Sequence, residues 1–331
     1  MGNRLLNKKV LLICPKTFDY HVEIINALGK MGAKVDYFDE RPSNTAISKI
    51  LIRVNKGLID SKIREYYKNI LNNIAKDSYD YVLIVKAESI PNDVILKLKK
   101  LNPKAKIILE LWDSIANNSA AQEKINLVDK AFSFDRNDCK KYNMNFRPLF
   151  YIEKYNDIAI KPSETKYDLL FVGTVHSDRY KVLKSLQAKL EKDGYKVFYY
   201  MYIPNKILYY IRKFIFGELK GASIEEFKFK SINQDEVLSL VSKSKVIVDI
   251  QHPKQTGLTM RTIEMLGANK KIITTNSNIT EYDFYSESNI CVVHRDMNNL
   301  DMEFFKSEYI PVANNIKEKY SIEAWLMELL Y

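Results

Sequence analysis

Short apolar runs alternate with helically periodic segments along the first half of the chain. Strands are predicted, in chain order, over residues 9–14, 34–38, 80–85, 106–111, 128–134 and 146–152. Between them, residues 21–32 repeat apolar positions at helical spacing and end at Gly32, and residues 91–101 do so with Pro91 in the first turn. Strands this apolar, separated by helices, predict a parallel sheet that helices cover on both faces.

The same alternation restarts after a polar stretch. Residues 155–166 contain proline and show no periodicity, so we interpret them as a linker. Beyond this linker, strands are predicted over residues 167–173, 196–203, 246–250 and 271–275, and helices over 179–194, 236–244 and a segment beginning near Arg261 and Glu264. Residues 316–331 predict an amphipathic helix that packs back toward the first half.

The pattern therefore predicts an α/β protein with two Rossmann-like domains whose parallel sheets face a central cleft. We place the N-terminal domain at residues 1–155, the second domain at 166–312 and the returning C-terminal segment at 313–331. A length of 331 residues agrees with two domains of ordinary size.

Composition narrows the class of protein. Apolar residues make up 46% of the chain, which is typical of a globular protein. The three cysteines, Cys14, Cys139 and Cys291, are widely separated, as expected of reduced residues in a cytoplasmic protein. We expect no signal peptide, because residues 1–9 lead directly into a strand, and no apolar run is long enough to span a bilayer.

The net charge of +10 predicts an anionic partner. Nucleic acid, an anionic membrane surface and small anionic ligands are the three alternatives. The basic residues are dispersed and form no recognition helix, so nucleic acid is disfavoured. Residues 204–221 and 46–58 combine basic and apolar side chains, which suits a helix lying in an anionic membrane interface. Ordinary helices packing on a sheet would have the same composition.

The most informative stretch is residues 246–276, a predicted strand, loop, helix and strand. Its charged groups, Arg261 and Glu264, fall at the start of the helix, next to the carboxyl end of the preceding strand. That edge binds ligands in open α/β sheets, and the N-terminus of a helix favours a diphosphate. Arg261 is expected to neutralise a phosphate and Glu264 to accept hydrogen bonds from ribose hydroxyls, although an ion pair within the helix is the alternative.

Other candidate residues also follow predicted strands. His21, His176 and His252 each lie in or after such a loop, where each could be a functional group or a hydrogen-bonded loop histidine. A site binding a metal through all three is disfavoured, because their spacing is long.

Asp113 follows the fourth predicted strand and is expected to act as a base or orient a sugar hydroxyl, or else to cap a helix. Gly173 opens a loop that leads to Arg179, whose guanidinium could hold a pyrophosphate or be solvated.

Several motifs are absent from the sequence. It contains no G-x-G-x-x-G dinucleotide motif, no P-loop and no G-x-S-x-G elbow, which disfavours dehydrogenases, NTPases and serine hydrolases. It also contains no Asp-x-Asp triplet, so we expect diphosphate charge to be met by basic side chains and helix ends without a metal or cofactor.

The segment HPKQTGLTMRTIEMLGANKKIITTN resembles the C-terminal donor domain of GT-B glycosyltransferases, in particular CgeB-like "glycosyl transferases group 1" proteins and bacterial enzymes of capsule, O-antigen or lipopolysaccharide assembly. The segments DYHVEIINALGKMGAKVDYFDERPSN and LELWDSIANNS are similar to acceptor-domain segments of such proteins. The resemblance covers most of the chain and is specific mainly in the second half. It implies a nucleotide-sugar donor, with Glu264 at the ribose and Gly257 near the diphosphate.

One position departs from the family pattern. Retaining relatives carry a glutamate eight positions before the ribose-binding one, where this chain has Thr256. Retaining stereochemistry therefore does not carry over. The resemblance to inverting relatives makes His21 the first candidate for the base and Asp113 the second.

We therefore expect a cytoplasmic glycosyltransferase, either free or peripheral on the inner membrane face, that transfers a sugar to a lipid-linked or polysaccharide acceptor. Arg179, Arg261 and His176 would hold the pyrophosphate of the donor. A nucleotide-sugar epimerase of the same fold and a non-catalytic nucleotide-sugar-binding subunit are the alternatives.

Overall fold

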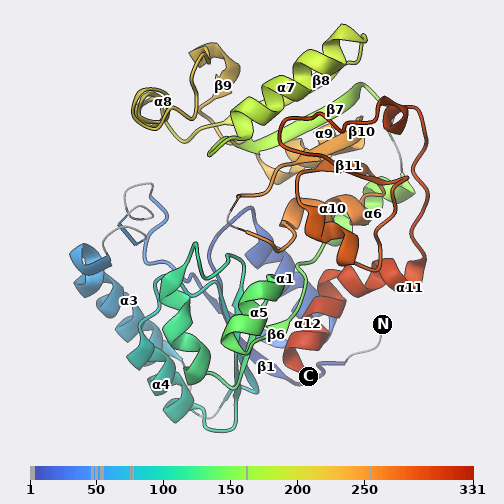
Figure 1. Cartoon of the computed structure of the whole chain (residues 1–331). Helices are drawn as coiled ribbons and strands as arrows, with labels where there is room; N and C mark the ends of the chain where they lie inside the picture. The colour runs from blue at the N-terminus through green and yellow to red at the C-terminus, as the bar shows by residue number, and fades with distance from the viewer. Residues whose placement is uncertain are drawn as a thin grey trace. The chain divides into compact units, whose positions relative to one another are not determined.

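The structure, a computed structural model, describes residues 4–331 except 46, 47, 49, 50, 53–55, 75, 77, 162 and 254. The chain forms two compact units (Figure 1). Unit 1 comprises Met1–Leu149 together with Ile322–Tyr331, and unit 2 comprises Phe150–Ser321. No helix in the described ranges is long and apolar enough to cross a bilayer.

Unit 1 contains a six-stranded parallel sheet in the order β2-β1-β3-β4-β5-β6. Its strands are β1 (Lys9–Ile13), β2 (Lys34–Phe38), β3 (Tyr81–Val85), β4 (Lys106–Leu111), β5 (Lys130–Ser133) and β6 (Asn145–Phe146). Its helical segments are α1 (Tyr20–Lys30), η1 (Lys56–Ile59), α3 (Asp60–Asn73), α4 (Asn92–Leu101), η2 (Ser119–Leu127), α5 (Arg136–Tyr142) and α12 (Ile322–Leu330).

Helices cover both faces of this sheet, which explains its continuous apolar strands. Every residue of β3 is buried. One face packs against α3 and α4, where Tyr67 and Leu98 are buried with Leu109 of β4. The neighbouring Glu110 points to the opposite face, where its Oε1 accepts a hydrogen bond from Trp325 of α12 at 3.4 Å.

Unit 2 repeats the design with the strand order β12-β11-β10-β7-β8-β9, again parallel. Its strands are β7 (Tyr167–Thr174), β8 (Val197–Tyr202), β9 (Phe227–Lys228), β10 (Ser244–Asp249), β11 (Lys271–Thr274) and β12 (Ile290–Val292). Its helical segments are α6 (Glu153–Ile160), α7 (Arg179–Lys192), α8 (Lys206–Tyr210), η3 (Ile211–Ile215), η4 (Ile224–Glu226), α9 (Gln234–Ser242), α10 (Met260–Gly267), η5 (Ser277–Glu281), η6 (Met302–Phe305), α11 (Asn314–Lys317) and η7 (Glu318–Tyr320).

Three sequence predictions about elements were wrong. Residues 155–166 are not simply a linker, because α6 covers Glu153–Ile160 and packs on α10. The strand predicted over 146–152 is reduced to β6. The predicted helix over 316–331 is divided into α11, η7 and α12, with extended backbone at Ser321 between the last two.

The structure describes one of the two basic, apolar segments in full and the other in part. Part of the predicted segment 46–58 lies outside the described residues, namely 46, 47, 49, 50 and 53–55. The segment 204–221 forms α8 and η3, and η3 is a π-helix.

Candidate functional site

The predicted donor-site residues of unit 2 lie at the carboxyl edge of its sheet. Neighbouring strands β7 and β10 end at Thr174 and Asp249. The loop after β7 carries His176 and leads into α7, and the loop after β10 carries His252 and leads into α10. Ligands bind at such an edge in open α/β sheets, so the predicted residues are at the right end of the strands.

The N-terminus of α10 is anchored directly to the end of β10. Thr259 is the N-cap of α10, and its side chain accepts a hydrogen bond from the backbone N–H of Thr262. The hydroxyls of Thr259 and Thr262 both donate to Oδ2 of Asp249, at 2.8 and 2.5 Å. The buried carboxylate therefore fixes the first turn of α10 against the sheet, and with it the positions of Arg261 and Glu264.

Glu264 is buried rather than solvated. It is 3% exposed, and its Oε2 lies 3.6 Å from Nε of Arg261. Tyr155, which comes from α6, lies near this carboxylate. Burial first, and then the charge of Glu264, raise the pKa of Tyr155. The intrahelical ion pair exists, but the carboxylate also belongs to a buried network, which the sequence could not reveal.

Arg179 ties the two central strands together. Its Nε donates to the carbonyl of Ile250 at 2.7 Å and its Nη1 to the carbonyl of Thr174 at 2.8 Å. Burial lowers the pKa of its guanidinium. The negative charge of Asp249 opposes this shift, and the positive charges of Arg261 and Arg295 add to it. Arg179 is therefore not a solvated arginine. It positions the carboxyl ends of β7 and β10 and adds positive charge to them.

Arg295 is a site residue that the sequence analysis missed. Its Nη1 donates to both carboxylate oxygens of Asp178, at 2.6 and 2.8 Å, and its Nη2 donates to the carbonyl of Gln251 at 3.1 Å. It follows β12, so the rule that selected the other candidates would have found it had that short strand been predicted. The structure thus gathers the charges of three arginines, Arg179, Arg261 and Arg295, at one sheet edge.

Two predicted histidines are brought together. The rings of His176 and His252 have centroids 5.5 Å apart, and Nδ1 of His176 lies 3.0 Å from the hydroxyl of Ser177. Burial first, and then the charge of Arg179, lower the pKa of His176 to about 3, so this ring is neutral near pH 7. Within the described part of the chain, no group of three His, Cys, Asp or Glu side chains is arranged to hold a metal ion.

The loop between β10 and α10 is fixed from β11. The side-chain amide of Asn276 donates to the carbonyls of Thr256 at 3.0 Å and of Gly257 at 3.3 Å. Gly257 is buried. Gly173, by contrast, lies inside β7, where an added Cβ would come within 3.3 Å of the ring of Phe171. This contact gives Gly173 a packing role.

The candidate base residues His21 and Asp113 share the corresponding edge of unit 1. His21 is the second residue of α1, and Asp113 follows β4. The residues just before them, Tyr20 and Trp112, make an edge-to-face contact with ring centroids 5.9 Å apart. The sequence prediction that both follow strands and lie at one edge is therefore consistent with the structure.

The two candidates differ in chemistry. Asp113 pairs with Nζ of Lys86 at 2.9 Å. His21 is 8% exposed, its ring packs on Tyr37, and its Nδ1 is buried with no hydrogen-bond partner among the described residues. Burial lowers the pKa of His21, which keeps its imidazole neutral and able to accept a proton near pH 7.

A buried ionic network beside these residues was not predicted. Arg41 follows β2 and its Nη2 lies 2.5 Å from Oε2 of Glu88, which follows β3, and both side chains are 5% exposed. Lys86 lies 3.5 Å from Oε1 of Glu88 and also pairs with Asp113. Burial raises the pKa of the adjacent Glu40 to about 7. Charged groups from three strands therefore converge at this edge.

Backbone strain is concentrated at the same edge. Phe18 and Asp19, just before α1, have φ of 47° and 58°, and Lys86 and Ala87, just after β3, have φ of 75° and 51°. Consecutive non-glycine residues in the left-handed region are costly, and such strain clusters at functional sites.

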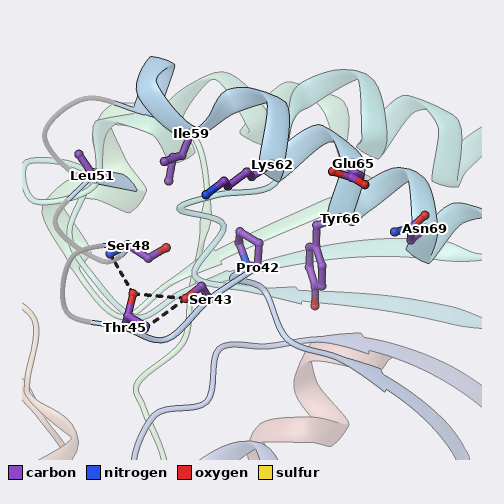
Figure 2. A pocket seen from close by; sticks show the side chains of 10 residues that line it. All are labelled: Pro42, Ser43, Thr45, Ser48, Leu51, Ile59, Lys62, Glu65, Tyr66 and Asn69. Carbon is purple, nitrogen blue, oxygen red and sulfur yellow. Dashed lines mark hydrogen bonds between the residues drawn. The ribbon is translucent and has the colours of Figure 1, made fainter.

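A separate pocket in unit 1 has a volume of about 380 Å³ (Figure 2). Figure 2 shows Lys62, Glu65 and Asn69 of α3 along one side and Ser43 and Thr45 on the other. The complete lining is Pro42, Ser43, Thr45, Ser48, Leu51, Ile59, Lys62, Glu65, Tyr66 and Asn69. None of the predicted site residues lines this pocket.

Comparison with known proteins gives a match in structure but not in sequence. No protein-family model matches the chain, and no curated protein matches it. Among solved structures, an alpha-glucosyltransferase in complex with UDP and DNA superposes with a TM-score of 0.58 and 15% identity, covering 98% of this chain and 95% of that chain.

Two further structures agree with this match. HepE from Anabaena, in complex with UDP and glucose, has a TM-score of 0.57 and 10% identity and covers 98% of this chain and 99% of that chain. A glycosyltransferase from Rickettsia africae has a TM-score of 0.56 and 13% identity, with coverages of 97% and 96%. At these identities the likeness shows the fold. The chain has the α/β GT-B fold, and the prediction of two Rossmann-like units, each with a parallel sheet, is confirmed.

Proposed function

We propose that this protein is a glycosyltransferase that transfers a sugar from a nucleotide-diphosphate sugar to a lipid-linked or polysaccharide acceptor in cell-surface glycan assembly. The reaction would take place in the cytoplasm. The fold supports it, because similar solved structures hold UDP, UDP with glucose, or UDP-glucose. The observation that carries it is the group of three arginines with a buried glutamate at the start of α10.

The donor would bind at the carboxyl edge of unit 2. Arg261, Arg295 and the N-terminus of α10 would supply positive charge for the diphosphate without a metal. Arg179 contributes through its charge, since two of its donors already bind backbone carbonyls. Neutral His176 would act as a hydrogen-bonding group rather than as a cation.

Glu264 would bind the ribose. A carboxylate accepts hydrogen bonds from sugar hydroxyls, and this one is held 3.6 Å from Nε of Arg261 at the start of α10. Because Tyr155, Arg261 and Asp249 fix its surroundings, little conformational entropy would be lost when the sugar carrier binds.

In unit 1, His21 would accept the proton of the acceptor hydroxyl, with Asp113 as the second candidate. Its neutral ring meets the first requirement for a base near pH 7. Asp113 is a weaker candidate because the ammonium of Lys86 stabilises its carboxylate.

Calorimetric titration of the protein with UDP-glucose and with UDP tests the donor site. Glu264→Gln and Arg261→Gln should each weaken binding about tenfold or more, as expected for the loss of hydrogen bonds between charged groups. Glu303→Gln and Lys306→Gln are matched controls, because they also form an i,i+3 pair in unit 2 but are exposed. Circular dichroism checks that each variant is folded.

Unchanged affinity in both Glu264→Gln and Arg261→Gln would refute the proposed donor site. One observation favours a second candidate function, a non-catalytic binding subunit, since Thr256 stands where retaining relatives carry a carboxylate, and its carbonyl is held by Asn276. Release of UDP from the donor by the purified protein separates the two, because a binding subunit would release none.

A further inference from the structure

The α8–η3 segment of unit 2 carries a cluster of exposed apolar side chains. Ile207, Phe214 and Ile215 are each 72% exposed, Phe216 is 65% exposed and Tyr210 is 50% exposed. We call these five residues the apolar tip. The rings of Tyr210 and Phe214 are stacked, with an interplanar angle of 5°, so the cluster has an ordered surface of its own.

The apolar tip is held outward by the opposite face of the same segment. Tyr209 is 1% exposed, packs on Phe227 of β9 with ring centroids 5.4 Å apart, and donates a hydrogen bond to the carbonyl of Ala222 at 3.0 Å. Figure 1 shows α8 beside β9, the strand at the edge of the sheet. The segment therefore packs on the core of unit 2 through Tyr209, and the side chains of the apolar tip are not buried in that core.

The segment that carries the apolar tip is basic. Residues 204–221 contain four Lys or Arg and a single acidic residue, Glu218. Lys206 and Lys220 are exposed, and the ammonium of Lys213 lies 5.7 Å from the centroid of the Phe214 ring. Glu218 lies 3.7 Å from Arg212, so its charge is partly compensated. The tip is thus an apolar surface with a positive rim.

We propose that the apolar tip inserts into the headgroup region of an anionic lipid membrane, with its basic rim on the lipid phosphates. Aromatic and aliphatic side chains beside Lys and Arg are the combination that binds such interfaces. The charge argues against a second copy of the chain, because a symmetric contact would bring two positive rims together. The inference goes beyond the proposed donor chemistry and does not depend on it.

Flotation with lipid vesicles tests the inference in the absence of any nucleotide sugar. Vesicles of equal parts phosphatidylglycerol and phosphatidylcholine should carry the whole protein upward at low salt, whereas pure phosphatidylcholine vesicles should carry little. High salt should reduce the bound fraction, because screening weakens the attraction of the basic rim.

Phe214→Ser combined with Ile215→Ser should lower the partition coefficient about tenfold or more, because two large side chains lose their burial in lipid. Lys206→Gln combined with Lys220→Gln should lower binding to anionic vesicles only. The matched control is Ile160→Ser combined with Ile310→Ser, which removes two other exposed isoleucines of unit 2, 65% and 58% exposed, and should leave binding unchanged.

Three results would overturn the inference. One is an absence of binding to anionic vesicles, and another is equal binding by the tip variant and the wild-type protein. The third is a concentration-dependent dimer that the Phe214→Ser, Ile215→Ser variant abolishes, without vesicle binding, since this would assign the tip to a second copy. UDP binding measured in parallel keeps a failure of the membrane inference distinct from a failure of the donor site.

Discussion

Protonation of Glu40 should make the stability of unit 1 depend on pH. Glu40 is 0% exposed; its Oε1 accepts a hydrogen bond from the backbone N–H of Ile90 at 3.1 Å, and its Oε2 is buried with no hydrogen-bond partner among the described residues. Burial is the main cause that raises its pKa from 4.5 to about 7. The hydrogen bond from the backbone N–H of Ser89 opposes this rise, the negative charge of Glu88 adds to it, and the positive charge of Arg41 opposes it. The neutral acid is therefore the form that the folded protein favours.

The sign and size of the effect follow from this shift. A carboxyl whose pKa is higher in the folded state binds more protons there, so its contribution to stability is complete below pH 4.5 and is lost as the pH rises through about 7. Each pKa unit corresponds to about 1.4 kcal/mol, so the shift amounts to about 3 kcal/mol of unfolding free energy. Glu40→Gln stays neutral and should lose this pH dependence.

Urea unfolding followed by tryptophan fluorescence is the assay, because both tryptophans, Trp112 and Trp325, lie in unit 1. The wild-type free energy of unfolding, relative to that of Glu40→Gln, should fall by about 3 kcal/mol between about pH 4.5 and about pH 8. Glu65→Gln, an exposed glutamate in the same unit, should show no such change. A wild-type to Glu40→Gln difference that is constant across this range would refute the reasoning.

Two further predictions concern packing and the base. Gly267→Ala should destabilise unit 2 by about 1–3 kcal/mol in urea unfolding followed by circular dichroism, because the added Cβ would lie 2.6 Å from Cγ of Tyr151. The control Gly29→Ala should not destabilise the protein, because a Cβ added there has no neighbouring atom within 4 Å. His21→Gln should lower kcat about a hundredfold or more. It should also remove the acid limb of the pH–rate profile, which lies below pH 6.5 because burial lowers the pKa of His21, whereas the control His294→Gln should preserve both kcat and the profile. A His21 variant that keeps the wild-type pH–rate profile would exclude His21 as the base.

The sequence alone determined the alternation of strands and helices. Continuous apolar runs such as β3 and β10 are typical of strands buried on both faces, and the periodic segments between them are typical of helices that cover those faces. The same local pattern located the candidate residues, because a residue that follows a buried strand must lie at the carboxyl edge of the sheet. His21, Asp113 and Arg261 were found in this way.

Segments whose structure depends on distant partners were not predictable. α6 has no convincing periodicity, and its helix is stabilised by packing on α10, with Tyr155 against Glu264. β6 is only two residues long because its pairing with β5 ends at Phe146. The apolar residues that follow do not reveal where the pairing between strands stops.

The charges that converge at each sheet edge were decided only by the tertiary structure. Arg295 is about 117 residues from Asp178 in the chain, and Arg41 is 47 residues from Glu88, so neither pair has a local signal. Burial then sets the protonation state of groups such as Glu40. Local periodicity specifies which face of an element is apolar, whereas ion pairs and desolvation depend on which elements the fold brings together.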